Sequence, residues 1–203
     1  MAAQVGLRER KKQQTRQAIY DAARRLFTES GFDNITVAEV AKAANVSEVT
    51  VFNYFPTKED LFYGGMHFFE EELLDAVRQR KPGEAAVKAF RRKLLESVDG
   101  LRSKQRFAAI RKATDALAAS PSLLARERQI VDSYTRGLAE LLHGGPEPDI
   151  ESVAIATALM GTHRAVVDYV RRKVGAGARG DALADDAAAQ IRKAFGRLER
   201  GLG

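Results

Sequence analysis

The stretch "VSEVTVFNYFPTKEDLF", residues 46–62, holds one very short helical segment between two sharp boundaries. Ser47 is a strong N-cap, because its hydroxyl can accept a hydrogen bond from a backbone N–H at the start of a helix. Pro56 ends the segment, since proline cannot continue a helix and donates no backbone hydrogen bond. Thr57 then offers a new N-cap at once. The pattern predicts a helix over residues 48–55 and the immediate start of another.

A second short helix precedes this one. Thr36 can cap it, and Glu39, three residues further on, can reach back to close a capping box. Asn45 interrupts it, because asparagine tolerates the left-handed backbone that a tight turn needs. Two short helices joined by such a turn, the second capped by Ser47, predict a helix-turn-helix.

The second of these helices is short enough to enter a DNA major groove, with its N-terminal residues at the base edges. Val51, Phe52 and Phe55 are expected to supply its apolar side. The remaining side chains are then exposed, and several carry hydroxyl or amide groups that suit bases and phosphates: Glu48, Val49, Thr50, Asn53 and Tyr54. The alternative is a compact helical bundle with a polar surface that binds no nucleic acid.

Almost every other segment also reads as helix, because apolar residues recur at intervals of three and four and strand-like alternation is nearly absent. An all-α fold of about nine helices is predicted. Gly31 ends the first helix and Thr57, with Asp60 at N3, opens the fourth, which runs to "KPG" at 81–83. The later helices are expected at about 84–99, 103–118, 121–143, 149–174 and 181–201.

Residues 16–62, "RQAIYDAARRLFTESGFDNITVAEVAKAANVSEVTVFNYFPTKEDLF", resemble the DNA-binding domain of the TetR family of bacterial transcriptional repressors. The shared features are a helix ending in "LF", a "GF" turn, "TV" before the second helix, a "VS" cap, an aromatic pair, and "KE" followed by Leu61. The resemblance implies a helix-turn-helix domain over residues 1–57 and an effector-binding and dimerisation domain over 58–203.

The resemblance also implies which residues contact DNA. Thr36, Tyr54 and Lys58 would contact phosphates, while base or groove contacts would come from Ser47, Glu48, Val49, Thr50 and Asn53. Asn45 stands where the family usually has glycine, and the turn geometry tolerates it. Phe52 stands where many members have tyrosine, so apolar contact, for instance with a thymine methyl group, replaces a hydroxyl contact.

Positive charge is concentrated at the N-terminus. The 203 residues carry a net charge of +6, and residues 1–25 hold seven basic and two acidic side chains, which leaves +5 there. Such an arm, at Arg8 to Arg16, is expected either to follow the DNA backbone or to enter a minor groove. The alternative is a solvated, disordered tail.

Composition argues against several other partners. The chain has no cysteine and three widely spaced histidines, so no metal site or cofactor is expected. The start of the sequence has no apolar signal segment, and no uncharged run is long enough to span a membrane. A cytoplasmic protein that does not associate with membranes is therefore expected.

The resemblance implies a homodimer in which the last two helices of each subunit form a four-helix bundle. Apolar stripes on these helices are compatible with that interface: Val153, Leu159, Val166, Val170, Ile191, Phe195 and Leu198. The alternative is that the same stripes pack within one subunit. A dimer would place two reading helices about 34 Å apart and would require a palindromic operator.

The middle helices are expected, again by resemblance, to enclose a small-molecule effector. The candidate lining residues are Met66, Phe69, Phe107, Ile110, Thr114, Tyr134 and His163. Each also suits an ordinary core position. Gly64 and Gly65 would lie inside the fourth helix, either as a hinge that moves with the effector or as a place where a neighbouring helix packs against bare backbone.

These observations predict a ligand-responsive repressor. An enzyme is disfavoured, because no nucleophile elbow, P-loop, zinc-protease or dinucleotide-binding motif is present. A DNA-packaging protein would share the charge but show little sequence preference. A regulator of the same fold that activates transcription, or that responds to a protein partner, also fits these residues.

Overall fold

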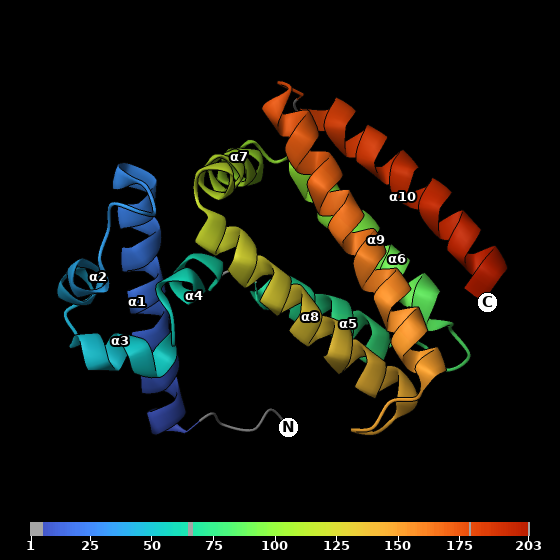
Figure 1. The fold of residues 1–203 in the computed structure, drawn as a ribbon, viewed down its shortest axis with the longest axis horizontal. Helices are drawn as coiled ribbons and strands as arrows, with labels where there is room; N and C mark the ends of the chain where they lie inside the picture. The colour runs from blue at the N-terminus through green and yellow to red at the C-terminus, as the bar shows by residue number, and fades with distance from the viewer. Residues whose placement is uncertain (1–5, 65–66, 179, 203) are drawn as a thin grey trace. The chain divides into compact units, whose positions relative to one another are not determined.

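The computed structural model describes residues 6–64, 67–178 and 180–202. Every regular element in these residues is helical, which confirms the all-α prediction (Figure 1). The chain divides into two compact units. The first comprises the chain up to Phe68 together with Ser120–Arg126, and the second comprises Phe69–Ala119 and Glu127 onward.

The first unit contains four helices: α1 (Leu7–Ser30), α2 (Val37–Ala43), α3 (Glu48–Tyr54) and α4 (Lys58–Tyr63). Their apolar sides meet in one core, in which Ile19, Val40, Val51, Phe55 and Leu61 are at most 2% exposed. Because α2 and α3 are too short to be stable alone, this shared core is what holds them in place.

The predicted caps of the short helices are all present. Thr36 Oγ1 accepts from the Glu39 backbone N–H at 3.2 Å while the Glu39 carboxylate accepts from the Thr36 N–H at 2.7 Å, which is a capping box. Asn45 has φ 54°, the left-handed conformation expected at the turn. Ser47 caps α3, and Thr57 with Asp60 forms the second capping box, at the start of α4. The helix-turn-helix prediction is therefore confirmed in its local geometry.

The region predicted as one fourth helix is described as two helices, α4 and α5 (His67–Arg78), and residues 65 and 66 between them lie outside the described residues. The described residues consequently hold ten α-helices and not about nine. Gly64 is buried, and a Cβ atom there would lie 2.9 Å from ring carbons of both Phe55 and Tyr20. Close packing against bare backbone therefore accounts for this glycine, while Gly65 is not described.

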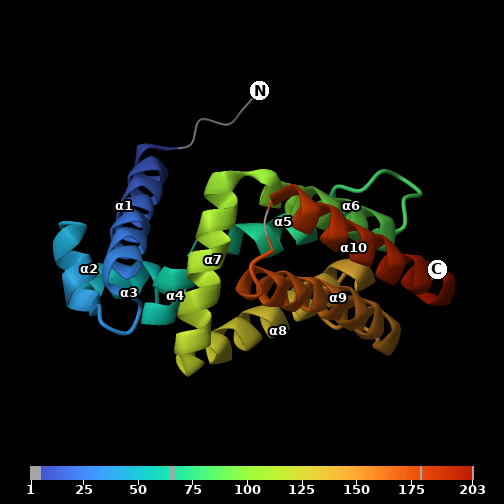
Figure 2. The same cartoon turned by 90° about the horizontal axis from the view of Figure 1, so that it is seen from above.

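The second unit is built from α5, α6 (Ala86–Asp99), a 3₁₀ turn η1 (Gly100–Arg102), α7 (Lys104–Ala119), most of α8 (Pro121–His143), α9 (Ile150–Gly175) and α10 (Gly180–Leu202). Helix α10 lies along α6 and α9, as Figure 2 shows from above. Phe90 of α6 stacks on Phe195 of α10, with 6.3 Å between ring centroids. Arg102 in η1 adds ion pairs to Asp181 and Asp185 at the start of α10.

Most of the predicted dimer residues belong to this core. Leu159, Val170, Ile191 and Phe195 are at most 6% exposed in the single chain, and Val166 and Leu198 pack against them. A side chain without exposed surface cannot contact a partner, so the expectation of interface contacts is wrong for the four buried residues. Val153, at 43% exposed, is the member of the set that faces solvent.

None of the helices in the described part of the chain is long and apolar enough to cross a membrane.

Candidate nucleic-acid interface

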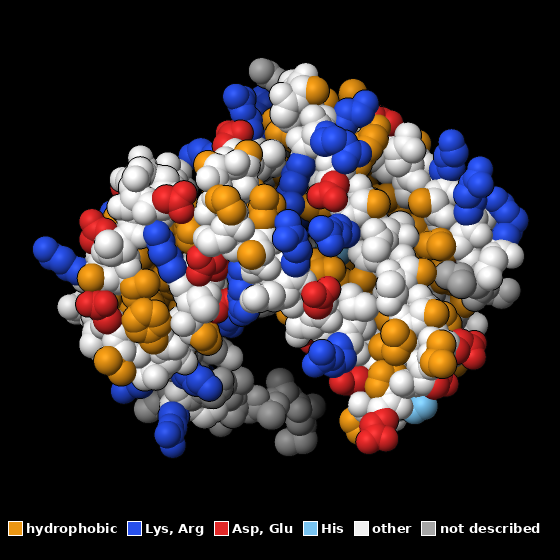
Figure 3. Space-filling view, in the orientation of Figure 1, with side chains coloured by type: hydrophobic (Ala, Val, Ile, Leu, Met, Phe, Trp, Pro, Cys, Tyr) orange, Lys and Arg blue, Asp and Glu red, His pale blue; other side chains and the backbone are white. Residues whose placement is uncertain are grey.

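Helix α3 is fixed by its own cap and by the core beneath it. Ser47 Oγ accepts from the Thr50 backbone N–H at 3.1 Å and lies 2.8 Å from Thr50 Oγ1. Val51 and Phe55 are buried, so one side of the helix cannot rotate away from the domain. The opposite side is consequently exposed to solvent, and Figure 3 shows hydrophobic side chains at the surface of the first unit.

Two large apolar side chains stand on that exposed side. Val49 is 69% exposed and Phe52 is 46% exposed, three residues apart and so on one helix face. The assignment of Phe52 to the buried side is therefore wrong, because the core contacts fall to Val51 and Phe55. Glu48 and Asn53 are exposed as expected, whereas Tyr54 is half-buried and packs against the core.

The two candidate phosphate ligands outside α3 are positioned differently. Thr36 Oγ1 donates to the Glu39 carboxylate at 2.8 Å, and hydrogen bonds from Thr36 hold the pKa of Glu39 below its usual value. A phosphate at Thr36 would therefore have to compete with a charged carboxylate. Lys58 Nζ lies over the Phe32 ring, 4.4 Å from its centroid, and donates to the Asp33 carbonyl at 3.4 Å. These contacts leave further N–H donors of Lys58 available to an anion.

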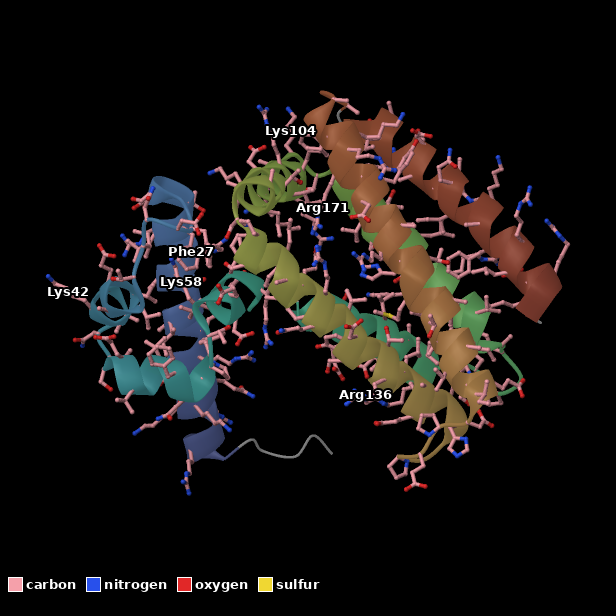
Figure 4. The ribbon with its side chains drawn as sticks, in the orientation of Figure 1. Phe27, Lys42, Lys58, Lys104, Arg136 and Arg171 are labelled. Carbon is pink, nitrogen blue, oxygen red and sulfur yellow. The ribbon has the colours of Figure 1, made fainter. Side chains whose placement is uncertain are left out.

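Lys42 is a cation of the helix-turn-helix that the sequence analysis did not single out. It is exposed in the last turn of α2 and points outward (Figure 4). The signal was present in the sequence, because Lys42 is the one charged residue in "VAKAAN" and follows Val40 and Ala41, which face the core.

The basic N-terminal segment is helical. Residues 8–16 form the first turns of α1, so the alternative of a disordered tail is wrong for these residues, while the contact of this arm with DNA stays a prediction. The Arg16 guanidinium lies 5.2 Å from the centroid of the Phe55 ring, at the C-terminal end of α3. The contact between Arg16 and Phe55 therefore links the basic segment to the end of α3 within the first unit.

The same unit includes the start of α8. Arg126 Nε and Nη2 donate to Asp60 at 2.8 and 2.7 Å, and the Asp60 carboxylate also accepts from the backbone N–H and hydroxyl of Thr57. Tyr63 donates its hydroxyl proton to the Leu123 carbonyl at 2.9 Å. Asp60 is only 4% exposed, and one carboxylate therefore both caps α4 and holds the first turn of α8.

The predicted effector residues that the structure describes belong to the second unit, and their role in binding an effector stays a prediction. Phe107, Ile110 and Tyr134 are half-buried and pack against the core of the second unit, and Thr114 donates to the Ile110 carbonyl. Met66 lies outside the described residues, and the side chain of Phe69 is not described.

His163 stands out among these candidates. It is 3% exposed, and burial is the main cause that lowers its pKa to about 4, with a smaller contribution from Arg171 opposed by Glu127. Arg171, which Figure 4 labels, donates two hydrogen bonds to Glu127, at 2.9 and 2.5 Å, and these bonds join α9 to α8. His163 is therefore neutral at pH 7 and lies beside a largely buried ion pair.

The capped helix α3, held on a rigid core and surrounded by cations, defines a DNA-binding protein of the helix-turn-helix class. Residues 19–63 match the sequence model described as "Bacterial regulatory proteins, tetR family". The chain is also 34% identical over 106 residues to the HTH-type transcriptional regulator TcmR of Streptomyces glaucescens, a match that covers 47% of each protein. These matches place residues 19–63 with the DNA-binding domain of the TetR family.

The match to TcmR spans about half the length of that relative. Solved structures agree over more of the chain. A TetR transcriptional regulator from Rhodococcus sp. RHA1 is 25% identical, with a TM-score of 0.51 over 93% of this chain and 98% of that one. The fatty acid degradation regulator FadR from Bacillus halodurans is 21% identical, with a TM-score of 0.53 over 90% and 95%, which shows a shared fold.

Proposed function

We propose that this protein is a transcriptional regulator that reads operator DNA with α3. The observation that carries the proposal is the rigid exposed face of α3, with Val49, Phe52 and Asn53 presented next to the Ser47 cap. Apolar side chains suit thymine methyl groups, and an amide suits the N6 and N7 positions of adenine. Phosphate contacts from Lys58 and Lys42 would set the register of the helix.

The proposed assembly is a homodimer on a palindromic operator. At the start of α9, Ile150 is 89% exposed and Val153 is 43% exposed, which is costly for apolar side chains in water. A second copy of the chain would cover them. The core residues of α9 and α10 would then support the interface from beneath and would not form it.

The proposed regulation is repression relieved by a small-molecule effector in the second unit. Consecutive residues of α8 support this route. Arg126 binds Asp60 in the first unit, and Glu127 binds Arg171 in the second. An effector that displaced Glu127 from Arg171 would shift the turn that also carries Arg126, and with it α4.

A competition titration tests the DNA-binding proposal. The purified chain should bind one selected duplex at least about a thousandfold more tightly than unrelated DNA of equal length, as specific DNA-binding proteins do. Replacing Asn53 with Ala should relax the base preference at one position, whereas the exposed α7 variant Lys112→Ala serves as the control. Equal affinity for all duplexes would instead indicate a DNA-packaging protein.

A further inference from the structure

The first turns of α1 carry a dense, exposed positive charge. Five cations lie within nine residues, and all five side chains are exposed: Arg8, Arg10, Lys11, Lys12 and Arg16. We call these residues the basic turns. The single acidic residue among them is Glu9.

This charge is unfavourable for the helix that bears it. The N-terminal end of a helix already carries a partial positive charge, so cations there oppose the helix dipole. Arg8, Lys12 and Arg16 follow one another at intervals of four and repel along one face. Gly6 at the N-cap provides no side-chain hydrogen bond. The ion pair that the described residues of α1 form joins Asp21 to Arg24, and both of these residues lie outside the basic turns.

The position of the basic turns relative to α3 follows from Arg16. Its guanidinium lies over Phe55, where α3 ends. Arg8 is eight residues earlier, which places it about 12 Å further along the helix axis. Figure 1 shows the start of α1 extending past α3 within the first unit. The B-DNA major groove is about 12 Å wide, so a helix in the groove leaves the bordering phosphates within reach of these side chains.

The chemistry of the segment favours duplex DNA over a lipid surface. Residues 8–17, "RERKKQQTRQ", contain no apolar side chain, and a helix that binds a membrane surface needs an apolar face. Duplex DNA carries one negative charge per about 1.7 Å of axis, which matches a closely spaced row of cations.

From these observations we propose that the basic turns form a second DNA contact, to the phosphates that flank the segment read by α3. The contact is independent of base sequence and relieves the repulsion at the start of α1. It rests on the proposed function of α3. The basic turns should therefore contribute affinity and salt dependence, and should not alter the preferred sequence.

The test compares Arg8→Gln, Lys11→Gln and Lys12→Gln in one variant with a matched control, Lys104→Gln, Arg111→Gln and Lys112→Gln on the exposed side of α7. Both variants carry three fewer positive charges than the wild type. Affinity for a selected duplex is measured between about 50 and 200 mM salt. If each cation neutralises one phosphate, the wild-type affinity should fall about 40-fold more over this range than that of the basic-turn variant, for each protomer bound.

A second arm uses a shortened duplex that keeps the selected sequence and lacks its flanks. Trimming should weaken the wild type and the α7 control but leave the basic-turn variant nearly unchanged. An unchanged salt slope in the basic-turn variant, or an equal change in the α7 control, would overturn the inference while sequence-specific binding by α3 still stood. If the wild type bound no DNA, the proposed function itself would fail.

Discussion

The buried His163 makes a quantitative prediction about pH and stability. Its pKa is about 4 in the folded chain, against an ordinary value of 6.5, because burial disfavours the imidazolium. Between these values the unfolded chain binds a proton that the folded chain does not, so stability falls as the pH falls through this range. From pH 7 to pH 5 the loss from this group is about 2 kcal/mol.

The assay is urea unfolding, followed by circular dichroism, at pH 7 and pH 5. Wild type is compared with His163→Gln, which keeps a polar side chain of similar size but does not titrate. The variant is expected to be less stable at both values, yet its loss between them should be smaller than that of the wild type by about 2 kcal/mol. The two proteins differ only at residue 163, so the difference between their losses isolates this side chain. An equal loss in the two proteins would refute the burial argument.

Three further substitutions probe the first unit. Gly64→Ala should destabilise the fold by about 1 to 3 kcal/mol in urea unfolding, because its Cβ would press on two aromatic rings; a neutral effect would contradict the close packing. Asp60→Ala should lower the free energy of unfolding by about 2 to 3 kcal/mol, because Arg126 and the Thr57 N–H lose a charged acceptor. An unchanged urea midpoint would show that this carboxylate does not contribute to stability. Lys58→Ala should weaken binding to all duplexes alike and lower the salt slope by about 0.9 for each phosphate that Lys58 neutralises in the wild type. A changed base preference would contradict that role.

Local signals explain why the helix-turn-helix could be predicted from the sequence. Thr36 with Glu39 forms its capping box within four residues, so the sequence alone determines that contact. Asn45 adopts the left-handed turn for the same local reason. Phe52 could not be placed by such rules, because a seven-residue helix has room for few core contacts and the neighbouring Val51 and Phe55 occupy them.

Contacts between residues far apart in the sequence could not be predicted from local patterns. The apolar stripes of α9 and α10 are compatible both with a dimer interface and with a core within one chain. The packing of Phe195 against Phe90 shows that Phe195 belongs to the core. The pairing of Asp60 with Arg126 joins residues 66 positions apart, and no local rule connects them. The helical basic turns were also missed, since charge repulsion at a helix start favours fraying.

The most direct test of the central claim is selection of bound sequences by the purified wild-type chain from a random pool of double-stranded DNA at near-physiological salt. Recognition by α3 in a homodimer predicts that the pool converges on a palindromic consensus, with half-sites about one helical turn, or a small multiple of it, apart. Salt-sensitive binding that enriches no sequence would contradict sequence-specific reading by α3.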